Sequence, residues 1–328
     1  MVKSGQGPFD TSSKRRDFCR TSSLVESGPG PFDTSDKRRD FCRTRAAVLQ
    51  MTSAPEVEAN LASARILLER AHAEGATIAA LPENFAIMGR NEADKIDAAE
   101  LPGEGPIQAF LGHCARELGL WIIGGTIPLR VDNEPRRVAA ASLVFDDRGR
   151  CVARYDKIHL FDVDIPDGVG SKPNERYRES ATVVPGSQTT VVSTPIGRVG
   201  MAVCYDVRFP ELFRVLQEQG AEVLSLPSAF TAPTGKAHWE LLARARAVEN
   251  LCYVLAPAQS GIHPNGRETW GDSLIVDPWG QVLTRVAEPG PGLAVAEIDR
   301  TVQQELRERF PALSHRRFIV APPAPTPS

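Results

Sequence analysis

The stretch Arg198–Leu212 reads RVGMAVCYDVRFPEL and combines an apolar run, a cysteine and a proline in a short space. Its apolar run Val199–Val203 is typical of a short buried strand. Pro210 is well placed for the first turn of a helix. A strand, a sharp turn and a helix start would hold the sulfur of Cys204 at the rim of a sheet, where enzymes often display a nucleophile. A free cysteine is more often a small buried apolar side chain, so this stretch alone leaves both interpretations open.

Two other segments place charged side chains after strand-like runs. The motif LPENF puts Glu83 directly after the apolar strand predicted at 77–81. The motif KIHLFD puts Lys157 among apolar residues after another predicted strand. Taken singly, Glu83 could be an exposed loop acid, since most glutamates are exposed, and Lys157 could pair with Asp156 or Asp162 on a surface.

The three segments together resemble the nitrilase superfamily of carbon–nitrogen hydrolases. LPENF, KIHLFD and GMAVCYDVRFPE agree with the three signature segments of that family in the same order, and the resemblance covers about Arg45 to Phe318. It implies an α/β fold, a four-layer α-β-β-α sandwich. It also implies that Glu83, Lys157 and Cys204 form a catalytic triad, and that copies of the chain associate as a homodimer or a higher homo-oligomer.

The residue types suit amide hydrolysis, which needs a nucleophile, a base, an oxyanion stabiliser and an acid. Cys204 would attack as the thiolate. Glu83 would take the thiol proton, return it to the leaving nitrogen and later activate water. Glu83 can serve this shuttle only if burial raises its pKa toward neutrality, and we therefore expect a raised pKa. Lys157 and the backbone N–H of Tyr205 would stabilise the oxyanion.

A second glutamate is implied by the resemblance, because the family often has one that is hydrogen-bonded to the lysine and orients the substrate. Glu179, in the run Tyr177–Ser180, matches that position. The preceding run 168–178 looks longer than in many members, so Glu175 remains an alternative.

Two further side chains are candidates for binding the substrate. Arg208 lies four residues after Cys204, where a planar guanidinium would suit a carboxylate. It could instead pair with Asp206 or Glu211. Thr234 could donate a hydroxyl hydrogen bond, or could only shape a turn.

The substrate class comes from the resemblance as well. CYDVRFPEL, LPSAFTAPTGKAHWELLARARA and VDPWG resemble the Nit branch, which implies hydrolysis of small carboxylate-bearing amides rather than nitriles. We expect hydrolysis of deaminated glutathione to 2-oxoglutarate and Cys-Gly. The alternative is an omega-amidase activity on 2-oxoglutaramate or another small amide of this kind.

Two other functional classes remain to be distinguished. A Cys–His hydrolase would use His159 or His238, and it would survive the change Glu83→Gln. A non-enzymatic scaffold would be unaffected by Cys204→Ala. The sequence contains neither a Gly-rich phosphate loop nor a metal-ligand cluster, so we expect no cofactor and no metal.

From residue 45 onward, strand and helix patterns alternate in the way that α/β domains show. Strands are predicted at 46–51, 77–81, 121–126, 138–145, 151–155, 199–203, 223–227, 252–257, 272–276, 282–285 and 293–297. Helices are predicted at 106–118, 210–219 and 238–249, and a helical apolar stripe runs over 61–71.

The first 44 residues have a different character. The segment at 4–21 recurs at 27–44 with two differences, and both copies are rich in Gly, Ser, Pro and charged residues. We expect residues 1–44 to form a disordered arm, residues 45–319 a hydrolase domain, and residues 320–328 a disordered Pro-rich tail. Alternatives for the arm are a basic docking tag, built on KRR at 14–16 and 37–39, and a mis-set start codon.

The composition is that of an ordinary soluble protein, with 42% hydrophobic and 24% charged residues among 328. A net charge of -3 gives no general reason to expect binding to nucleic acid or anionic membranes. No apolar run approaches the roughly 18 residues of a membrane span. The first residues lack the apolar core of a secretory signal, and the six cysteines show no CxxC pair. We therefore expect a cytoplasmic enzyme whose partner is a small-molecule amide.

Overall fold

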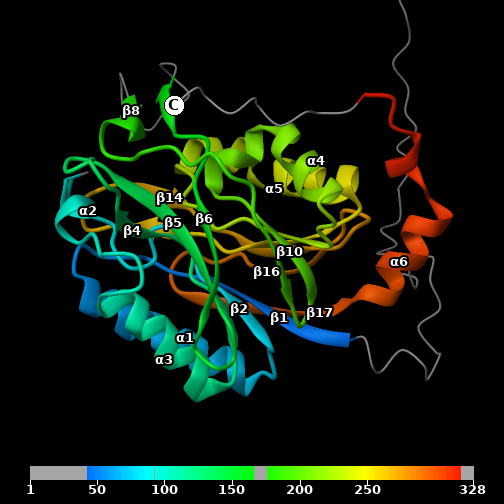
Figure 1. Cartoon of the computed structure of the whole chain (residues 1–328), viewed down its shortest axis with the longest axis horizontal. Coiled ribbons are helices and arrows are strands. Elements are labelled where there is room, and N and C mark those ends of the chain that lie inside the picture. Colours follow the sequence, from blue (N-terminus) through cyan, green and yellow to red (C-terminus); the bar gives the residue numbers. More distant parts are fainter. Residues whose placement is uncertain (1–42, 92, 166–175, 319–328) are drawn as a thin grey trace, which may run out of the picture. The chain divides into compact units, whose positions relative to one another are not determined.

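Two β-sheets packed face to face form the centre of the computed structural model, which describes residues 43–91, 93–165 and 176–318 (Figure 1). The first sheet has the order β17-β1-β2-β3-β5-β4, and β6 also pairs with β5. Its strands are β1 (Arg43–Gln50), β2 (Ile78–Ala80), β3 (Trp121–Ile123), β4 (Ile127–Arg130), β5 (Val138–Phe145), β6 (Cys151–Asp156) and β17 (Gly292–Asp299). β1, β2 and β3 run parallel to one another, whereas the other pairings in this sheet are antiparallel.

The second sheet has the order β16-β15-β12-β11-β10-β9. Its strands are β9 (Val191–Thr194), β10 (Gly197–Met201), β11 (Val223–Ser225), β12 (Tyr253–Ala256), β15 (Ser273–Val276) and β16 (Val282–Val286). At its centre β10, β11 and β12 are parallel. Both sheets therefore have parallel strands in the middle, and the loops that leave the carboxyl ends of those strands can meet at one rim.

Helices cover the outer face of each sheet (Figure 1). The outer face of the first sheet packs against α1 (Val57–Ala73) and α3 (Pro106–Leu118), and that of the second against α4 (Pro210–Glu218) and α5 (Ala232–Asn250). The other elements are α2 (Asp94–Asp97), α6 (Arg300–Arg309), the hairpins β7 (Asp162–Asp164) with β8 (Arg176–Arg178) and β13 (Ser260–Ile262) with β14 (Glu268–Trp270), and 3-10 turns at Glu179–Ala181, Cys204–Arg208 and Ala312–His315. The predicted four-layer α-β-β-α sandwich is confirmed.

Strand β1 shows why the strands read as continuous apolar runs. Ala46 and Val48 are buried between the two sheets, whereas Ala47 and Leu49 are buried against α1 and α3. Successive side chains of a strand point to opposite faces, so a strand covered on both faces needs apolar residues at every position.

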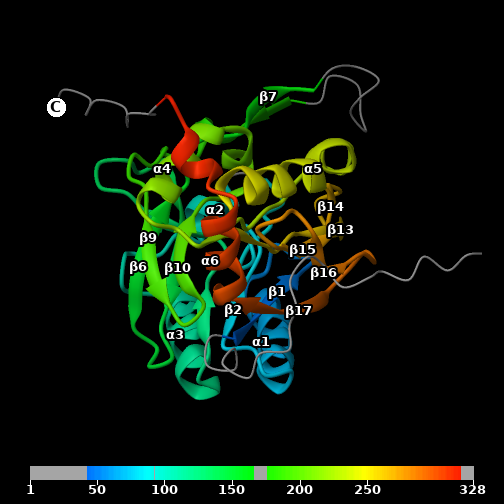
Figure 2. The ribbon, with the colours of Figure 1, turned by 90° about the vertical axis from the view of Figure 1, so that its right-hand side faces the viewer.

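Helix α6 closes the rim opposite to the carboxyl ends of the parallel strands (Figure 2). Gln303 donates to the carbonyl oxygens of Glu222 and Leu251, at 2.7 and 2.9 Å. These two residues lie just before β11 and β12 respectively. The carboxyl-end rim is therefore the one that remains for a substrate.

Several predicted bounds differ from those in the structure. α3 and β5 have the predicted bounds, but α5 begins at Ala232 rather than at 238 because Thr231 is extended and Pro233 is accepted in the first helical turn. β1 begins at Arg43, which is two residues before the predicted domain boundary. Strands β4 and β9, the β7–β8 and β13–β14 hairpins, and helices α2 and α6 were not predicted.

The remaining parts of the predicted arm (residues 1–42) and the predicted tail (residues 320–328) lie outside the described residues, so both stay predictions. Among the described residues, no helix is long and apolar enough to cross a membrane.

Candidate active site

Three loops at the carboxyl ends of strands bring Glu83, Lys157 and Cys204 together. Glu83 follows β2, Lys157 follows β6 and Cys204 follows β10, so two of them come from the first sheet and one from the second. The Nζ of Lys157 lies 2.8 Å from an Oε of Glu83, and the Glu83 carboxylate forms a hydrogen bond with the Cys204 thiol. All three side chains are buried. The structure thus places the three predicted catalytic residues in one cluster.

Glu179 completes this cluster from the segment after β8. Its two carboxylate oxygens lie 2.8 and 2.9 Å from Lys157 Nζ, and one of them accepts a hydrogen bond of 2.7 Å from the backbone N–H of Phe161. Glu179 therefore occupies the place predicted for the second glutamate. The rival, Glu175, lies outside the described residues.

The turn that carries Cys204 has a backbone conformation that is rare for a residue with a side chain. Cys204 has φ +47°, and its N–H donates to the carbonyl of Pro227 at 2.9 Å. The left-handed region costs roughly 1 to 2 kcal/mol for such a residue, so the surrounding structure must hold it there. Such a sharp turn between a strand and a helix presents a nucleophile at the edge of a sheet.

The buried carboxylate of Asp206 holds this turn. One of its oxygens accepts hydrogen bonds from the backbone of Val203 (2.8 Å) and from the hydroxyl of Tyr155 (2.7 Å). The other accepts from the backbone N–H of His159 (3.0 Å) and lies 2.7 Å from that residue's Nδ1. Asp206 thereby ties the Cys204 turn to the segment that carries Lys157.

The two histidines considered for a Cys–His hydrolase are engaged elsewhere. The ring of His159 contacts Asp206 and stacks on Phe209 with the ring centres 3.8 Å apart. His238 Nδ1 lies 3.3 Å from both terminal nitrogens of Arg208. The group that is hydrogen-bonded to the Cys204 thiol is a carboxylate, so the geometry favours the Cys-Glu-Lys arrangement.

The charges of the cluster fix its resting protonation. Burial raises the pKa of Glu83, but the ammonium of Lys157 opposes this and the net pKa lies below the ordinary value. Burial would lower the pKa of Lys157, but the carboxylates of Glu179 and Glu83 raise it well above its ordinary value. Burial and the charge of Glu83 raise the pKa of the Cys204 thiol. The resting site therefore holds a carboxylate, an ammonium and a thiol.

The prediction that the pKa of Glu83 is raised toward neutrality is wrong in its direction. It counted burial but not the contact of 2.8 Å with Lys157. A carboxylate beside a thiol of raised pKa can still act as its base, because the proton moves as the sulfur attacks.

The backbone around Glu83 is fixed by residues that the sequence interpretation did not single out. Gln259 donates to the carbonyl of Glu83 at 3.0 Å and to the hydroxyl of Ser53 at 2.7 Å, and its side chain is fully buried. Asn84 adopts φ 56° and its N–H donates to the hydroxyl of Thr126 at 2.8 Å. A buried glutamine next to a strand is the signal that could have indicated this support.

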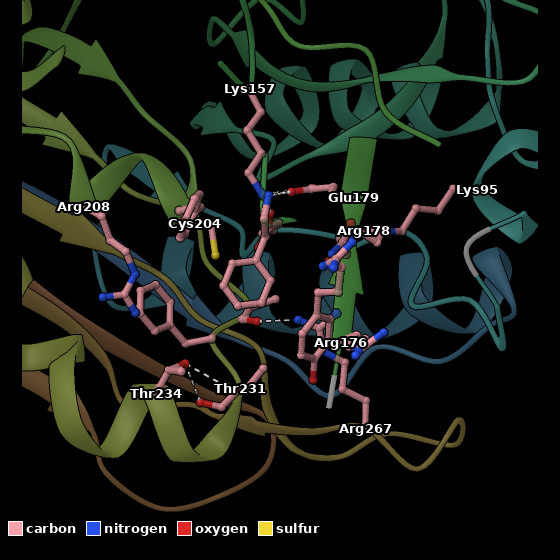
Figure 3. Close-up of a pocket in the computed structure, with 17 residues that line it drawn as sticks. Lys95, Lys157, Arg176, Arg178, Glu179, Cys204, Arg208, Thr231, Thr234 and Arg267 are labelled. Atoms are coloured by element: carbon pink, nitrogen blue, oxygen red, sulfur yellow. Dashed lines mark hydrogen bonds and ion pairs between the residues drawn. The ribbon is translucent and has the colours of Figure 1, made fainter. Parts of the chain in front are cut away.

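A cavity of about 130 Å³ opens from the cluster to solvent (Figure 3). Cationic and aromatic side chains dominate its lining, which comprises Lys95, Arg176, Arg178, Arg208, Arg267, Phe161, Tyr177, Tyr205 and Phe230 among others. Within the described ranges no group of three or more His, Cys, Asp or Glu is arranged to hold a metal ion. The lining suits a small anionic organic molecule.

Arg208 lies at one side of this cavity. Its guanidinium carbon is 5.9 Å from the centre of the Tyr205 ring and 5.6 Å from that of Phe230. Its suggested partner Asp206 is occupied by other groups, and in the described part of the chain no carboxylate forms an ion pair with Arg208. Tyr205, whose backbone N–H is the predicted oxyanion donor, also lines the cavity.

Thr234 lines the cavity from the first turn of α5. Its hydroxyl lies 2.8 Å from that of Thr231 and 3.3 Å from the carbonyl of the same residue. A Cβ at the next residue, Gly235, would lie 2.1 Å from the Cβ of Trp270, so a glycine is needed where Trp270 packs against this turn of α5. A substrate contact by Thr234 stays a prediction.

Comparisons with known proteins agree with this site. The sequence model of the carbon–nitrogen hydrolase family matches residues 45–308. Over 276 residues the chain is 44% identical to the deaminated glutathione amidase of Synechocystis sp. (strain PCC 6803 / GT-S), covering 84% of this chain and 98% of that protein. It is 43% identical to the deaminated glutathione amidase of Homo sapiens over 274 residues, which cover 83% of this chain and 81% of that protein. The crystal structure of Saccharomyces cerevisiae Nit3, a member of branch 10 of the nitrilase superfamily, matches with a TM-score of 0.74 at 30% identity, covering 84% and 97%.

Proposed function

Because this chain belongs to the carbon–nitrogen hydrolase family, we propose that it is an amidase that hydrolyses deaminated glutathione to 2-oxoglutarate and Cys-Gly. The observation that carries the proposal is the buried contact of Glu83 with both Lys157 and the Cys204 thiol, beside an arginine-lined cavity. Relatives that carry the name of this activity are 43–44% identical over most of their length.

The substrate's chemistry fits the cavity. Deaminated glutathione is an amide whose acyl part ends in a 2-oxo acid and whose amine part ends in the carboxylate of glycine. It therefore carries an anion at each end and a scissile amide between them. A cavity that has arginines on its walls and a thiol inside meets these needs.

Acylation begins with proton transfer. Glu83 takes the Cys204 proton as the sulfur attacks the amide carbon, and the carbonyl electron pair moves onto oxygen. The ammonium of Lys157 and the backbone N–H of Tyr205 stabilise this oxyanion. When the oxyanion collapses, the carbon–nitrogen bond breaks, and Glu83 gives its proton to the departing amine of Cys-Gly. A 2-oxoglutaryl thioester on Cys204 remains.

Deacylation repeats these steps with water. Glu83 takes a proton from a water molecule as the water oxygen attacks the thioester carbon. The same groups stabilise the oxyanion again. The carbon–sulfur bond breaks, 2-oxoglutarate leaves, and Glu83 returns its proton to the thiolate. The thiol and the carboxylate of the resting enzyme are restored, and one water molecule has been consumed.

Relative activity on two substrates tests the proposal. We expect kcat/KM for deaminated glutathione to exceed that for 2-oxoglutaramate by at least about tenfold, because only the larger substrate fills the amine side of the cavity with a charged group. Both are assayed by the 2-oxoglutarate released, after subtraction of the rate with the Cys204→Ala variant. A higher value for 2-oxoglutaramate would support the omega-amidase alternative and contradict the proposal.

The proposed enzyme works in the cytoplasm. In support, free cysteines without disulfides are typical of compartments that keep thiols reduced. The cysteines in the described part of the chain, Cys114, Cys151, Cys204 and Cys252, are free.

The proposed enzyme also associates with a second copy through the outer face of α5. Large apolar side chains are exposed there and beside it: Leu241 (66% exposed), Val248 (46%) and Trp279 (54%). Exposed apolar groups of this size often mark contact surfaces. We expect light scattering to give a dimer or a larger assembly, and the change Leu241→Glu to shift it toward the monomer. A monomeric wild-type protein at assay concentrations would contradict this.

A further inference from the structure

Arg267 is another of the arginines that line the cavity, and it lies on the other side of Cys204 from Arg208 (Figure 3). It sits at the end of the turn that joins β13 to β14. The turn is closed by hydrogen bonds of 2.8 Å from the His263 N–H to the Arg267 carbonyl and of 2.9 Å from the Arg267 N–H to the side chain of Asn265. The backbone that carries this guanidinium is therefore fixed.

The guanidinium of Arg267 is held in place by one hydrogen bond and one ring contact. One terminal nitrogen donates to the carbonyl of Ala229 at 2.9 Å, and the guanidinium carbon lies 5.5 Å from the centre of the Tyr177 ring. Its Nε is buried and has no hydrogen-bond partner among the residues that the structure describes. In the described part of the chain no carboxylate forms an ion pair with Arg267. A guanidinium that lines a cavity without a carboxylate partner can pair with the carboxylate of a bound molecule.

The position of Glu83 decides which part of the substrate faces Arg267. Glu83 gives its proton to the leaving nitrogen, so the amine part of the substrate lies on the side of this carboxylate. Arg267 lines the same cavity as Glu83, and its charge makes only a small contribution to the lowered pKa of that carboxylate. Arg208 instead extends from the turn that carries the nucleophile and lies among the rings of Tyr205 and Phe230. The two arginines thus flank the reacting atoms from the amine side and the acyl side.

We infer that Arg267 binds the carboxylate of the leaving group, which in deaminated glutathione is the carboxylate of glycine, while Arg208 binds the 2-oxo acid carboxylate of the acyl group. This assignment rests on the proposed function. It makes Arg267 the residue that selects a substrate with an anionic amine part over a simple amide.

A carboxamide analogue of the substrate tests the assignment. In deaminated glutathione with a glycinamide end, the acyl group, the scissile bond and the leaving nitrogen are all unchanged. We expect the wild-type enzyme to lose about 10- to 100-fold in kcat/KM on this analogue, mainly through KM, because a charge-assisted contact is lost.

Variants at the two arginines separate binding from other effects. Arg267→Gln should lower kcat/KM for deaminated glutathione by a similar factor. Its kcat/KM for the carboxamide analogue should stay near the wild-type value. Arg267→Lys should restore part of the preference. Arg208→Gln should lower kcat/KM for both substrates by the same factor, so that the preference of the wild-type enzyme for the carboxylate is kept. Thermal unfolding of each variant checks that its fold is intact.

Two results would overturn the assignment. If the wild-type enzyme hydrolyses deaminated glutathione and the analogue with equal kcat/KM, Arg267 does not bind the carboxylate of the leaving group. The same conclusion follows if Arg267→Gln lowers kcat/KM for both substrates equally, since a change in the charge around Glu83 would have that effect. If the wild-type enzyme does not hydrolyse deaminated glutathione at all, the proposed function fails and the assignment fails with it.

Discussion

The variant Cys204→Ala should lose at least about 10⁴-fold in kcat on deaminated glutathione, because no other group in the cluster can form the thioester. Cys204 is 8% exposed, and its neighbours in the cavity are mainly charged or aromatic side chains. None of them replaces the thiol as the nucleophile. Binding should persist, because the arginines remain. Release of 2-oxoglutarate measures turnover, and calorimetric titration with substrate measures binding.

Cys252 offers a matched control for this variant. Its thiol is also fully buried, and burial raises its pKa to about 12, but it does not line the cavity and contacts the carbonyls of Ala221 and Asn250. Cys252→Ala should therefore keep the wild-type kcat. Retention of more than a few per cent of turnover by Cys204→Ala would mean that another residue carries the chemistry.

Glu83→Gln should lower kcat by about 10²- to 10⁴-fold with KM within a few fold of wild type. Glutamine has nearly the same shape and still offers an oxygen to Lys157, but it can neither take the thiol proton nor give one to the leaving amine. The Lys157 ammonium keeps its contacts of 2.8 and 2.9 Å with Glu179, so the cluster keeps a counter-charge. A wild-type rate in this variant would favour a Cys–His hydrolase.

The pH profile of the wild-type enzyme tests the protonation state of Glu83. The active base is the carboxylate, and Lys157 lowers its pKa, so the carboxylate persists as the pH falls below the ordinary glutamate value of about 4.3. We expect kcat/KM, which reports the free enzyme, to stay on its plateau at pH 5 to 6 and to fall only below the ordinary value. Half-maximal activity near pH 7 would show instead a raised pKa of Glu83. Circular dichroism at each pH checks that the fold persists.

The sequence was most informative where chemistry and local structure coincide. Glu83, Lys157 and Cys204 each follow a strand, and this position can be read from the apolar runs before them. That they meet depends on the pairing of strands far apart in the chain, since 74 residues separate Glu83 from Lys157. No local pattern encodes such a contact, and the family resemblance supplied it.

Arg267 shows what the sequence could not indicate. It lies in a turn beside glycine and glutamate, where a charged residue is ordinarily solvated. Only the packing of the β13–β14 hairpin against the site brings its guanidinium to the ring of Tyr177 and to the neighbourhood of Glu83. The direction of the Glu83 pKa was missed for the same reason, because it depends on a contact between two sheet-end loops.

Trapping the acyl-enzyme shows which residue carries the acyl group during turnover. Wild-type enzyme is mixed with deaminated glutathione, quenched in acid within the first turnovers, digested and analysed by mass spectrometry. We expect one 2-oxoglutaryl group on the peptide that contains Cys204. It should be absent from Cys204→Ala and lost when the native enzyme is left to complete turnover. An acyl group on another residue, or full turnover by enzyme whose Cys204 is blocked, would contradict it.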